Sequence, residues 1–165
     1  MANYKGHIAG GLVTGIVYVG ATQFLPSNYS AYTSGILQDN QMLAGLLIIS
    51  MLFALWPDID TNSKGQDIFF GMAFVVDVFL IATGHIEAAA YFGLLAMFPI
   101  LGKHRGWTHT KWAMLLVPSP IVLVPYLYRE SILDTSLIFY GAAVAGYFSH
   151  LLLDGLIVKW IRVKN

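Results

Sequence analysis

Four short segments of this sequence carry histidine or aspartate beside apolar runs. They are GHIAGG at 6–11, WPDID at 56–60, HRGWTH at 104–109 and FSHLLLDG at 148–155. The chain has no cysteine, so a bound metal would take imidazole nitrogen and carboxylate oxygen as its ligands. Such ligands suit zinc, with manganese or iron as alternatives, and the segments therefore predict a divalent metal site.

The spacing within two segments supports shared ligation. His150 and Asp154 are four residues apart, so on a helix their side chains lie on one face and can reach a common ion. We expect Pro57 to end the preceding helix and to extend the chain, so that Asp58 and Asp60 point the same way. Two carboxylates held together favour a cation between them.

The HRGWTH segment fits a single helical face poorly, because His104 and His109 are five residues apart. We expect His104 in a loop and His109 in the first turn of the next helix, with Thr108 as the N-cap of that helix. Both histidines would then lie at one end of the helix, beside the other three segments.

Each segment also has an explanation without metal. His7 would be an interfacial polar residue, the aspartates after Pro57 would form a turn, and His150 with Asp154 would be a buried hydrogen-bonded pair. The basic loop around His104 would contact lipid headgroups. Metal is favoured over these explanations because ionisable residues are rarely placed in membranes without a function, and here several converge on one face.

The elements that must position these residues are membrane helices. Of the 165 residues, 57% are hydrophobic and 11% are charged, whereas a soluble domain has about 25% charged residues. Apolar runs predict helices near 8–25, 42–56, 68–83, 87–101, 112–128 and 135–157. We therefore predict an all-α, polytopic transmembrane bundle of about six short helices that forms one domain, 1–165.

Two features modify this six-helix prediction. Most of the runs are shorter than the roughly 20 residues that cross a bilayer comfortably, so four spans remain the alternative. Pro118, Pro120 and Pro125 predict that the fifth helix is kinked or broken.

Glycines such as Gly10 and Gly146 provide small-residue surfaces that would make the first and last helices neighbours.

Basic residues set the predicted orientation. In the six-helix topology only Arg129 lies on one side, and the other side carries the remaining lysines and arginines. These are Lys5, Lys64, Lys103, Arg105, Lys111, Lys159, Arg162 and Lys164. The positive-inside rule then places both termini and all four segments at the cytoplasmic face of the inner membrane. The zero net charge argues against nucleic acid as a partner, which leaves the lipid bilayer.

Taken together and in order, the four motifs resemble a family of LexA-regulated, membrane-bound, predicted metal-dependent hydrolases from bacteria and archaea. The resemblance spans nearly the whole chain, and PDID followed by HRG-aromatic-TH and SHxxxD is its specific combination. It implies a metal site at His7, Asp58, Asp60, His104, His109, His150 and Asp154. A more distant likeness of that family is to zinc-dependent phospholipase C.

Such a site predicts hydrolysis by a metal-activated water. Seven candidate ligands exceed the three or four that hold one zinc ion, so one or two ions are expected. The substrate would be a phosphoester or an ester, with a lipid-linked phosphoester favoured by the position at the membrane surface. Asp58, Asp60 or Asp154 would act as the general base. Arg105 would hold an anionic group bidentately, or else serve only as a topology-determining charge.

Two rival functions use the same residues. A metal-binding or metal-transporting protein would hold an ion that moves or stabilises the bundle, with Asp77 as a waypoint inside the membrane. A purely structural cluster would tie the helix ends together and bind no stoichiometric metal. The sequence leaves the oligomeric state open.

Overall fold

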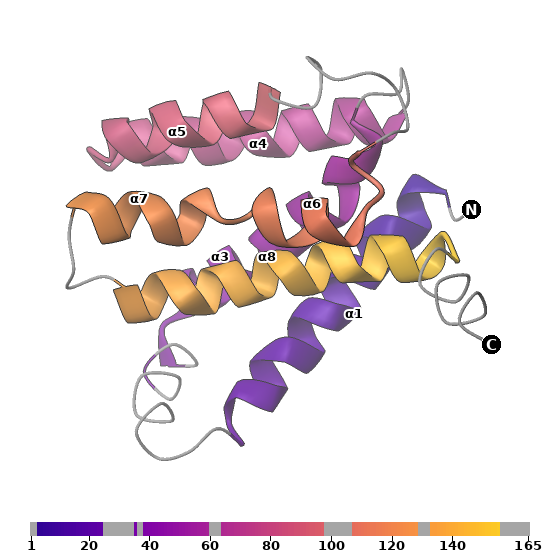
Figure 1. Cartoon of the computed structure of the whole chain (residues 1–165). Coiled ribbons are helices and arrows are strands. Elements are labelled where there is room, and N and C mark those ends of the chain that lie inside the picture. Colours follow the sequence, from indigo (N-terminus) through magenta and orange to yellow (C-terminus); the bar gives the residue numbers. More distant parts are fainter. Residues whose placement is uncertain are drawn as a thin grey trace.

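The computed structural model describes residues 3–24, 35, 38–59, 64–97, 107–128 and 133–155, and the regular elements within them are helices. In chain order these are α1 (Tyr4–Thr22), α3 (Asn40–Leu55), the short 3₁₀ helix η1 (Trp56–Asp58), α4 (Lys64–Ala82), α5 (Ile86–Met97), α6 (Lys111–Leu116), α7 (Pro120–Tyr128) and α8 (Leu133–Leu153) (Figure 1). The predicted all-α bundle is confirmed.

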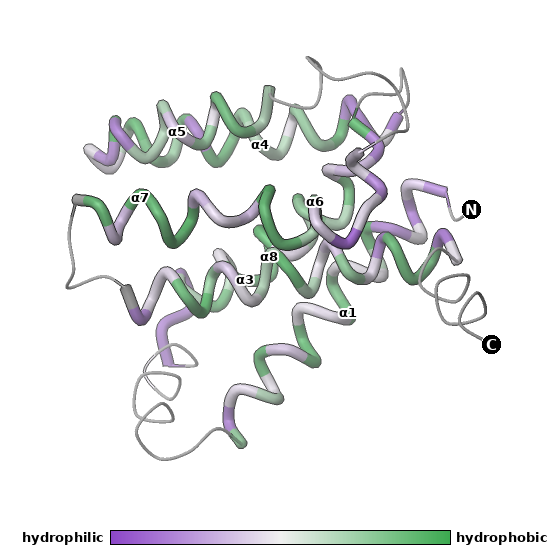
Figure 2. Tube along the Cα trace, viewed as in Figure 1, coloured by the Kyte–Doolittle hydropathy of each residue, from purple (hydrophilic) through white to green (hydrophobic). Residues whose placement is uncertain are grey.

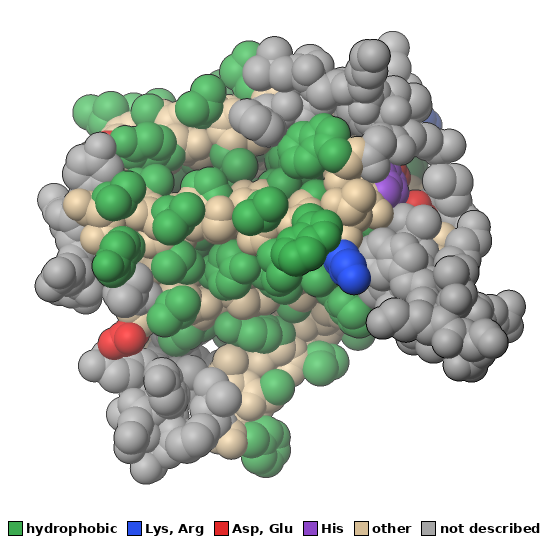
Figure 3. Space-filling model, in the orientation of Figure 1, with side chains coloured by type: hydrophobic (Ala, Val, Ile, Leu, Met, Phe, Trp, Pro, Cys, Tyr) green, Lys and Arg blue, Asp and Glu red, His purple; other side chains and the backbone are tan. Residues whose placement is uncertain are grey.

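The outer surface of the bundle is apolar. Three of the described helical segments are long and apolar enough to cross a membrane: Asn40–Asp58, Lys64–Ala82 and Asp134–Leu153. Hydrophobic residues run along the helices (Figure 2), and their side chains cover much of the visible face (Figure 3). Phe74 is 69% exposed and Leu127 is 73% exposed. Apolar surface of this extent fits a lipid environment, where it costs nothing.

The helices α1, α3 and α8 pack on one another more extensively than any other described elements do. Glycine makes this close approach possible. A Cβ atom on Gly11 of α1 would lie 3.0 Å from the carbonyl oxygen of Ser50 in α3, and one on Gly146 of α8 would collide with that same oxygen. The Ser50 hydroxyl in turn donates to the carbonyl of Gly11 at 2.8 Å. Small residues therefore let three backbones meet, as expected for membrane helices.

The prolines break the fifth predicted helix. α6 ends at Leu116, a turn covers 117–119, and α7 begins at Pro120. Pro118 has no backbone N–H to continue the helical ladder, and its ring crowds the preceding turn. The Ser119 hydroxyl donates to the carbonyl of Leu116 at 2.7 Å, which satisfies a group that the break exposes. The predicted interruption of this helix is confirmed.

A hairpin of α4 and α5 packs beside this core. The turn between the two helices contains Gly84 with a φ of 81°, a conformation that favours glycine. Phe69 of α4 belongs to the buried apolar core, and the indole N–H of Trp56 donates to the carbonyl of Leu95 in α5 at 3.4 Å. The hairpin is thereby tied to the segment that follows α3.

The helix ends sort into two groups. The starts of α1, α4 and α6 lie at the same end of the bundle as η1 and the end of α8 (Figure 1). The turn from α4 to α5, the end of α7 and the start of α8 lie at the opposite end. This is the arrangement that the six-helix topology predicts for the residues with metal-binding chemistry.

Candidate metal centre

His7 lies in the second turn of α1, and the start of that helix fixes its position. Asn3 caps the helix, because its side-chain oxygen accepts a hydrogen bond from the backbone N–H of Gly6 at 3.0 Å. The backbone N–H of His7 donates to the carbonyl of Asn3 at 3.1 Å. The side chain of His7 is 2% exposed and lies against Asp58, just after α3, and Asp154, just after α8.

Asp58 is the last residue of η1. The prediction that the chain is extended after Pro57 is therefore wrong. Trp56 has φ −52° and ψ −41°, and the chain continues from α3 into a 3₁₀ turn. Proline permits this because its fixed φ suits the first position of a new helical turn. The turn brings Asp58 back over the end of α3 and toward the histidines. Asp60, its expected partner, lies outside the described residues.

His109 precedes a helix and does not belong to its first turn. α6 begins at Lys111, and its N-cap is Thr110, whose hydroxyl accepts from the backbone N–H of Ala113 at 3.1 Å. The prediction of Thr108 as the cap is therefore wrong by two residues. Thr108 instead places its hydroxyl 3.0 Å from Nδ1 of His109. The other end of the ring is then directed toward Asp58.

His150 and Asp154, at the end of α8, are arranged as their four-residue spacing predicts. The helix is regular to Leu153, and the backbone N–H of Asp154 still donates to the carbonyl of His150 at 3.0 Å. Gly155, with a φ of 71°, ends this turn. Nε2 of His150 lies 3.7 Å from Oδ2 of Asp154. The two side chains therefore share one face.

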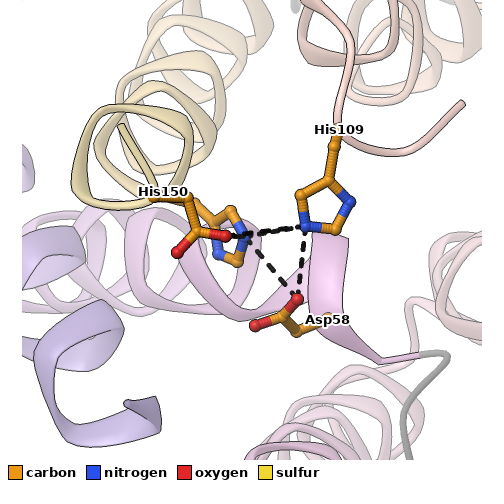
Figure 4. A group of neighbouring side chains, drawn as sticks. Asp58, His109 and His150 are labelled. Atoms are coloured by element: carbon orange, nitrogen blue, oxygen red, sulfur yellow. Dashed lines mark hydrogen bonds and ion pairs between the residues drawn. The ribbon is translucent and has the colours of Figure 1, made fainter. Parts of the chain in front are cut away.

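Three histidines and two aspartates from four parts of the chain meet at this point, and Figure 4 labels Asp58, His109 and His150 among them. Asp58 Oδ1 lies 3.3 Å from Nε2 of His109 and 3.8 Å from Nε2 of His150. Asp154 Oδ1 lies 3.5 Å from Nε2 of His7. The Nε2 atoms of His109 and His150 are 3.4 Å apart. Two imidazole nitrogens this close repel unless a proton or a cation lies between them.

These separations match the donor spacing of a small cation. With bonds of about 2.0–2.2 Å, the ligand atoms of a tetrahedral zinc ion stand roughly 3.3–3.6 Å from one another. Asp58, His109, His150 and Asp154 each offer an atom within a group whose members lie within 4.8 Å of one another. The histidine–aspartate pairs at 3.7–3.9 Å would have to contract by a few tenths of an ångström, and a pair at the 4.8 Å limit by roughly 1.2 Å, to complete a tetrahedral shell.

Burial supports the same conclusion. Both ring nitrogens of His7 and both carboxylate oxygens of Asp154 are buried and make no hydrogen bond among the described residues. Buried polar atoms without partners cost about 1–3 kcal/mol each, and native proteins seldom leave several together. A cation would satisfy the Asp154 oxygens and one nitrogen of His7. The donor set therefore fits a divalent metal ion.

One residue of the surroundings was not predicted from the sequence. Tyr147 is fully buried in α8, and its hydroxyl donates a short hydrogen bond to the backbone carbonyl of Thr108. This bond anchors the turn that carries His109 to the helix that carries His150. The sequence could have pointed to Tyr147 because it lies three residues before His150, a spacing that places both side chains on one helical face.

The structure brings together His7, Asp58, His109, His150 and Asp154 of the seven predicted ligands. The other two, Asp60 and His104, lie outside the described residues, as does Arg105. Asp58, His109, His150 and Asp154 supply the four donors of one ion, with His7 beside them, and the expectation of one or two ions stays a prediction.

Comparison with known protein families identifies the family to which this chain belongs. No curated protein matches the chain, and no solved structure does. The model of one protein family covers nearly its full length, from the segment before His7 to beyond Asp154. That match, over residues 1–162, shows that the chain belongs to the YdjM inner membrane protein family.

Proposed function

We propose that this membrane protein is a metal-dependent hydrolase that acts on a phosphoester or an ester. The observation that carries the proposal is the convergence of His7, Asp58, His109, His150 and Asp154, in which the buried ring nitrogens of His7 and carboxylate oxygens of Asp154 make no hydrogen bond among the described residues. Zinc is the favoured ion, because a mixed set of imidazoles and carboxylates at this spacing suits it. The family resemblance in the sequence motifs also supports this reaction class, and LexA control stays a prediction.

The exposure of the side chains differs among the ligands, and this difference suggests which of them hold the ion and which acts as the general base. The side chains of His150 and Asp154 are 0% and 2% exposed, whereas that of Asp58 is 31% exposed. The buried side chains would hold the ion, and a substrate would approach from the side of Asp58. A bound divalent ion supplies a Lewis acid that polarises a phosphoryl or acyl oxygen and activates water. Asp58 would take up a proton as the general base, a role for which Asp60 remains the alternative.

The position of the centre in the fold supports a substrate at the membrane surface. The site lies at the ends of α1, α3 and α8 rather than midway along them. We place this end in the cytoplasm, because the basic residues of the sequence gather on that side. A lipid-linked phosphoester could reach the centre from the inner leaflet, with Arg105 holding its anionic group.

Metal content tests the centre first. Elemental mass spectrometry of detergent-purified protein should find one or two equivalents of a transition metal. His150→Ala and Asp154→Ala should each lose it, because each removes a buried ligand from a set with few to spare. His85→Ala is the matched control, since His85 is exposed in the turn at the opposite end of the bundle. A folded wild type that holds no metal even after reconstitution would refute the metal centre.

Turnover tests the reaction class. Metal-loaded protein should release phosphate or alcohol from a panel of phospholipids and lipid phosphomonoesters. Asp58→Ala should lower that rate by about a hundredfold or more, which is the usual contribution of a general base. No turnover of any lipid phosphoester or ester by metal-loaded wild type would refute the hydrolase while leaving the metal centre in place.

Metal transport is the second candidate, and one observation favours it. Oδ1 of Asp77, within the membrane helix α4, is buried and makes no hydrogen bond among the described residues. Such a carboxylate could serve as an intermediate site for a moving ion. Transport predicts metal flux into proteoliposomes that falls in Asp77→Asn. No flux with the wild type would rule transport out, and a flux unchanged in the variant would rule out Asp77 as the intermediate site.

A further inference from the structure

An apolar groove lies between α5 and the broken helix α6–α7. It has a volume of about 330 Å³, and its walls include Tyr91, Leu94 and Leu95 on one side with Leu116 and Pro120 on the other. Trp107 also lines it. The break at Pro118 separates α6 from α7 where the groove forms. The lining is hydrophobic, so water would fill it only at a cost in free energy.

The groove opens toward the lipid. Leu94 and Leu116, on opposite walls, are each 64% exposed, so the rim belongs to the apolar outer surface of the bundle. In a bilayer the molecules that touch this surface are acyl chains. A groove of this size lies within the range of about 300–1,000 Å³ that small-molecule sites occupy.

The groove also adjoins a segment that supplies a ligand to the metal centre. Trp107, which lines it, precedes the ligand His109 by two residues, and two residues of chain span at most about 7 Å. The ring of Trp107 meets that of Trp56 edge to face, with centroids 5.8 Å apart. Trp56 in turn precedes the ligand Asp58 by two residues. The segment that carries Trp107 and His109 therefore both lines the groove and supplies a ligand, and the segment that carries Trp56 and Asp58 packs against it.

We infer that this groove binds an acyl chain of a membrane lipid whose phosphate headgroup lies at the metal centre. The inference rests on the proposed function and narrows its substrate to lipid phosphoesters. The groove supplies affinity through the apolar chain, while the centre meets only the polar end of the molecule. A soluble phosphoester lacks the chain and loses that part of the affinity.

Native mass spectrometry of the metal-loaded protein with dioleoyl phosphatidic acid tests this inference. Wild type should carry one bound lipid through removal of the detergent. Leu116→Trp should weaken that binding by about tenfold or more, because displacing even two methylenes from an apolar site has this effect. Leu123→Trp is the matched control, since Leu123 is an exposed leucine of α7, 52% exposed, that does not line the groove.

Leu94→Trp fills the groove from the opposite wall and replaces Leu116→Trp if that variant does not fold. Lipid bound equally by wild type, both groove variants and the control overturns the inference, as does wild type that binds no lipid. Metal content measured on the same samples separates the two proposals. Groove-dependent lipid binding without metal would refute the metal centre, and with it the position of the headgroup, and would leave only the acyl-chain groove. Full metal without groove-dependent binding would refute the groove and leave the metal centre in place.

Discussion

His150 illustrates how one hydrogen bond prepares a ligand. Its Nδ1 lies 2.8 Å from the backbone carbonyl oxygen of Ala54, so Nδ1 carries the proton and Nε2 presents a lone pair. The same Nε2 faces Asp58 and Asp154. Metal-binding histidines usually have such a bond on the far side of the ring, and it fixes both tautomer and orientation. Because the acceptor is backbone, the arrangement depends on the packing of α8 on α3.

Tyr147 should influence metal affinity without touching the ion. Its hydroxyl holds the carbonyl of Thr108, so Tyr147→Phe frees the turn that carries His109. We expect metal affinity to fall by about tenfold, as for other residues that support ligands. Tyr140→Phe is the control, since the Tyr140 hydroxyl donates to the carbonyl of Leu115, away from the ligands. Equal affinities in a competition titration with a chromogenic chelator would exclude the positioning role.

Replacing His7 with an apolar residue should weaken metal binding without lowering the Tm in chelator. In the metal-free protein both its ring nitrogens are buried without hydrogen bonds, and replacing such a group with an apolar one of similar size is often neutral or stabilising. His7→Leu should therefore keep or raise the Tm in chelator while weakening metal binding. Scanning calorimetry with and without added zinc measures both effects. A clear fall in Tm in chelator would point to a structural role for the imidazole.

At the scale of elements, glycine contacts determine where the ligands meet. His7 and His150 stack with ring centroids 4.0 Å apart, although they lie on α1 and α8. That distance requires the two helices to approach closely. A Cβ on Gly10 would lie 2.7 Å from a side-chain carbon of Leu153, so no larger residue fits there without movement. The packing of α1, α3 and α8 thus sets the dimensions of the site.

Gly146→Ala should be destabilising for this reason. Its Cβ would collide with the backbone carbonyl of Ser50, which cannot move as a side-chain tip could. Overpacking of this kind costs about 1–3 kcal/mol, so the Tm in detergent should fall. Gly20→Ala, at a helical position with nothing within 4 Å of the new atom, should leave the Tm unchanged or raise it. Similar effects of the two substitutions would show that the contact at Gly146 is unimportant.

Local rules predicted most of this architecture. The helices, the break near Pro118 and the shared face of His150 and Asp154 depend on neighbours in sequence, so they could be predicted from it. The 3₁₀ turn at Trp56 and the turn that carries His109 could not. At each of these two turns several backbone conformations are close in energy, and contacts with other helices determine which one is adopted.

At the scale of the whole molecule, the site is assembled from segments far apart in sequence at one end of the bundle. The topology predicted from the sequence brings these segments together, because each lies at a helix end on the same side. The bond from Tyr147 to Thr108 and the groove beside Trp107 were beyond such reasoning. They depend on how side chains from different helices fit together, which the order of helices does not specify.

Orientation in the membrane is the remaining property of the whole molecule, and single cysteines can measure it because the chain has none. Asp67 in the first turn of α4 and His85 in the turn at the opposite end are both exposed. Replacing an aspartate should leave the topology unchanged, since acidic residues contribute little to it. A membrane-impermeant maleimide added to intact spheroplasts should label His85→Cys and should spare Asp67→Cys until the membrane is permeabilised. The reverse pattern would place the metal centre, and any lipid it acts on, in the outer leaflet of this membrane.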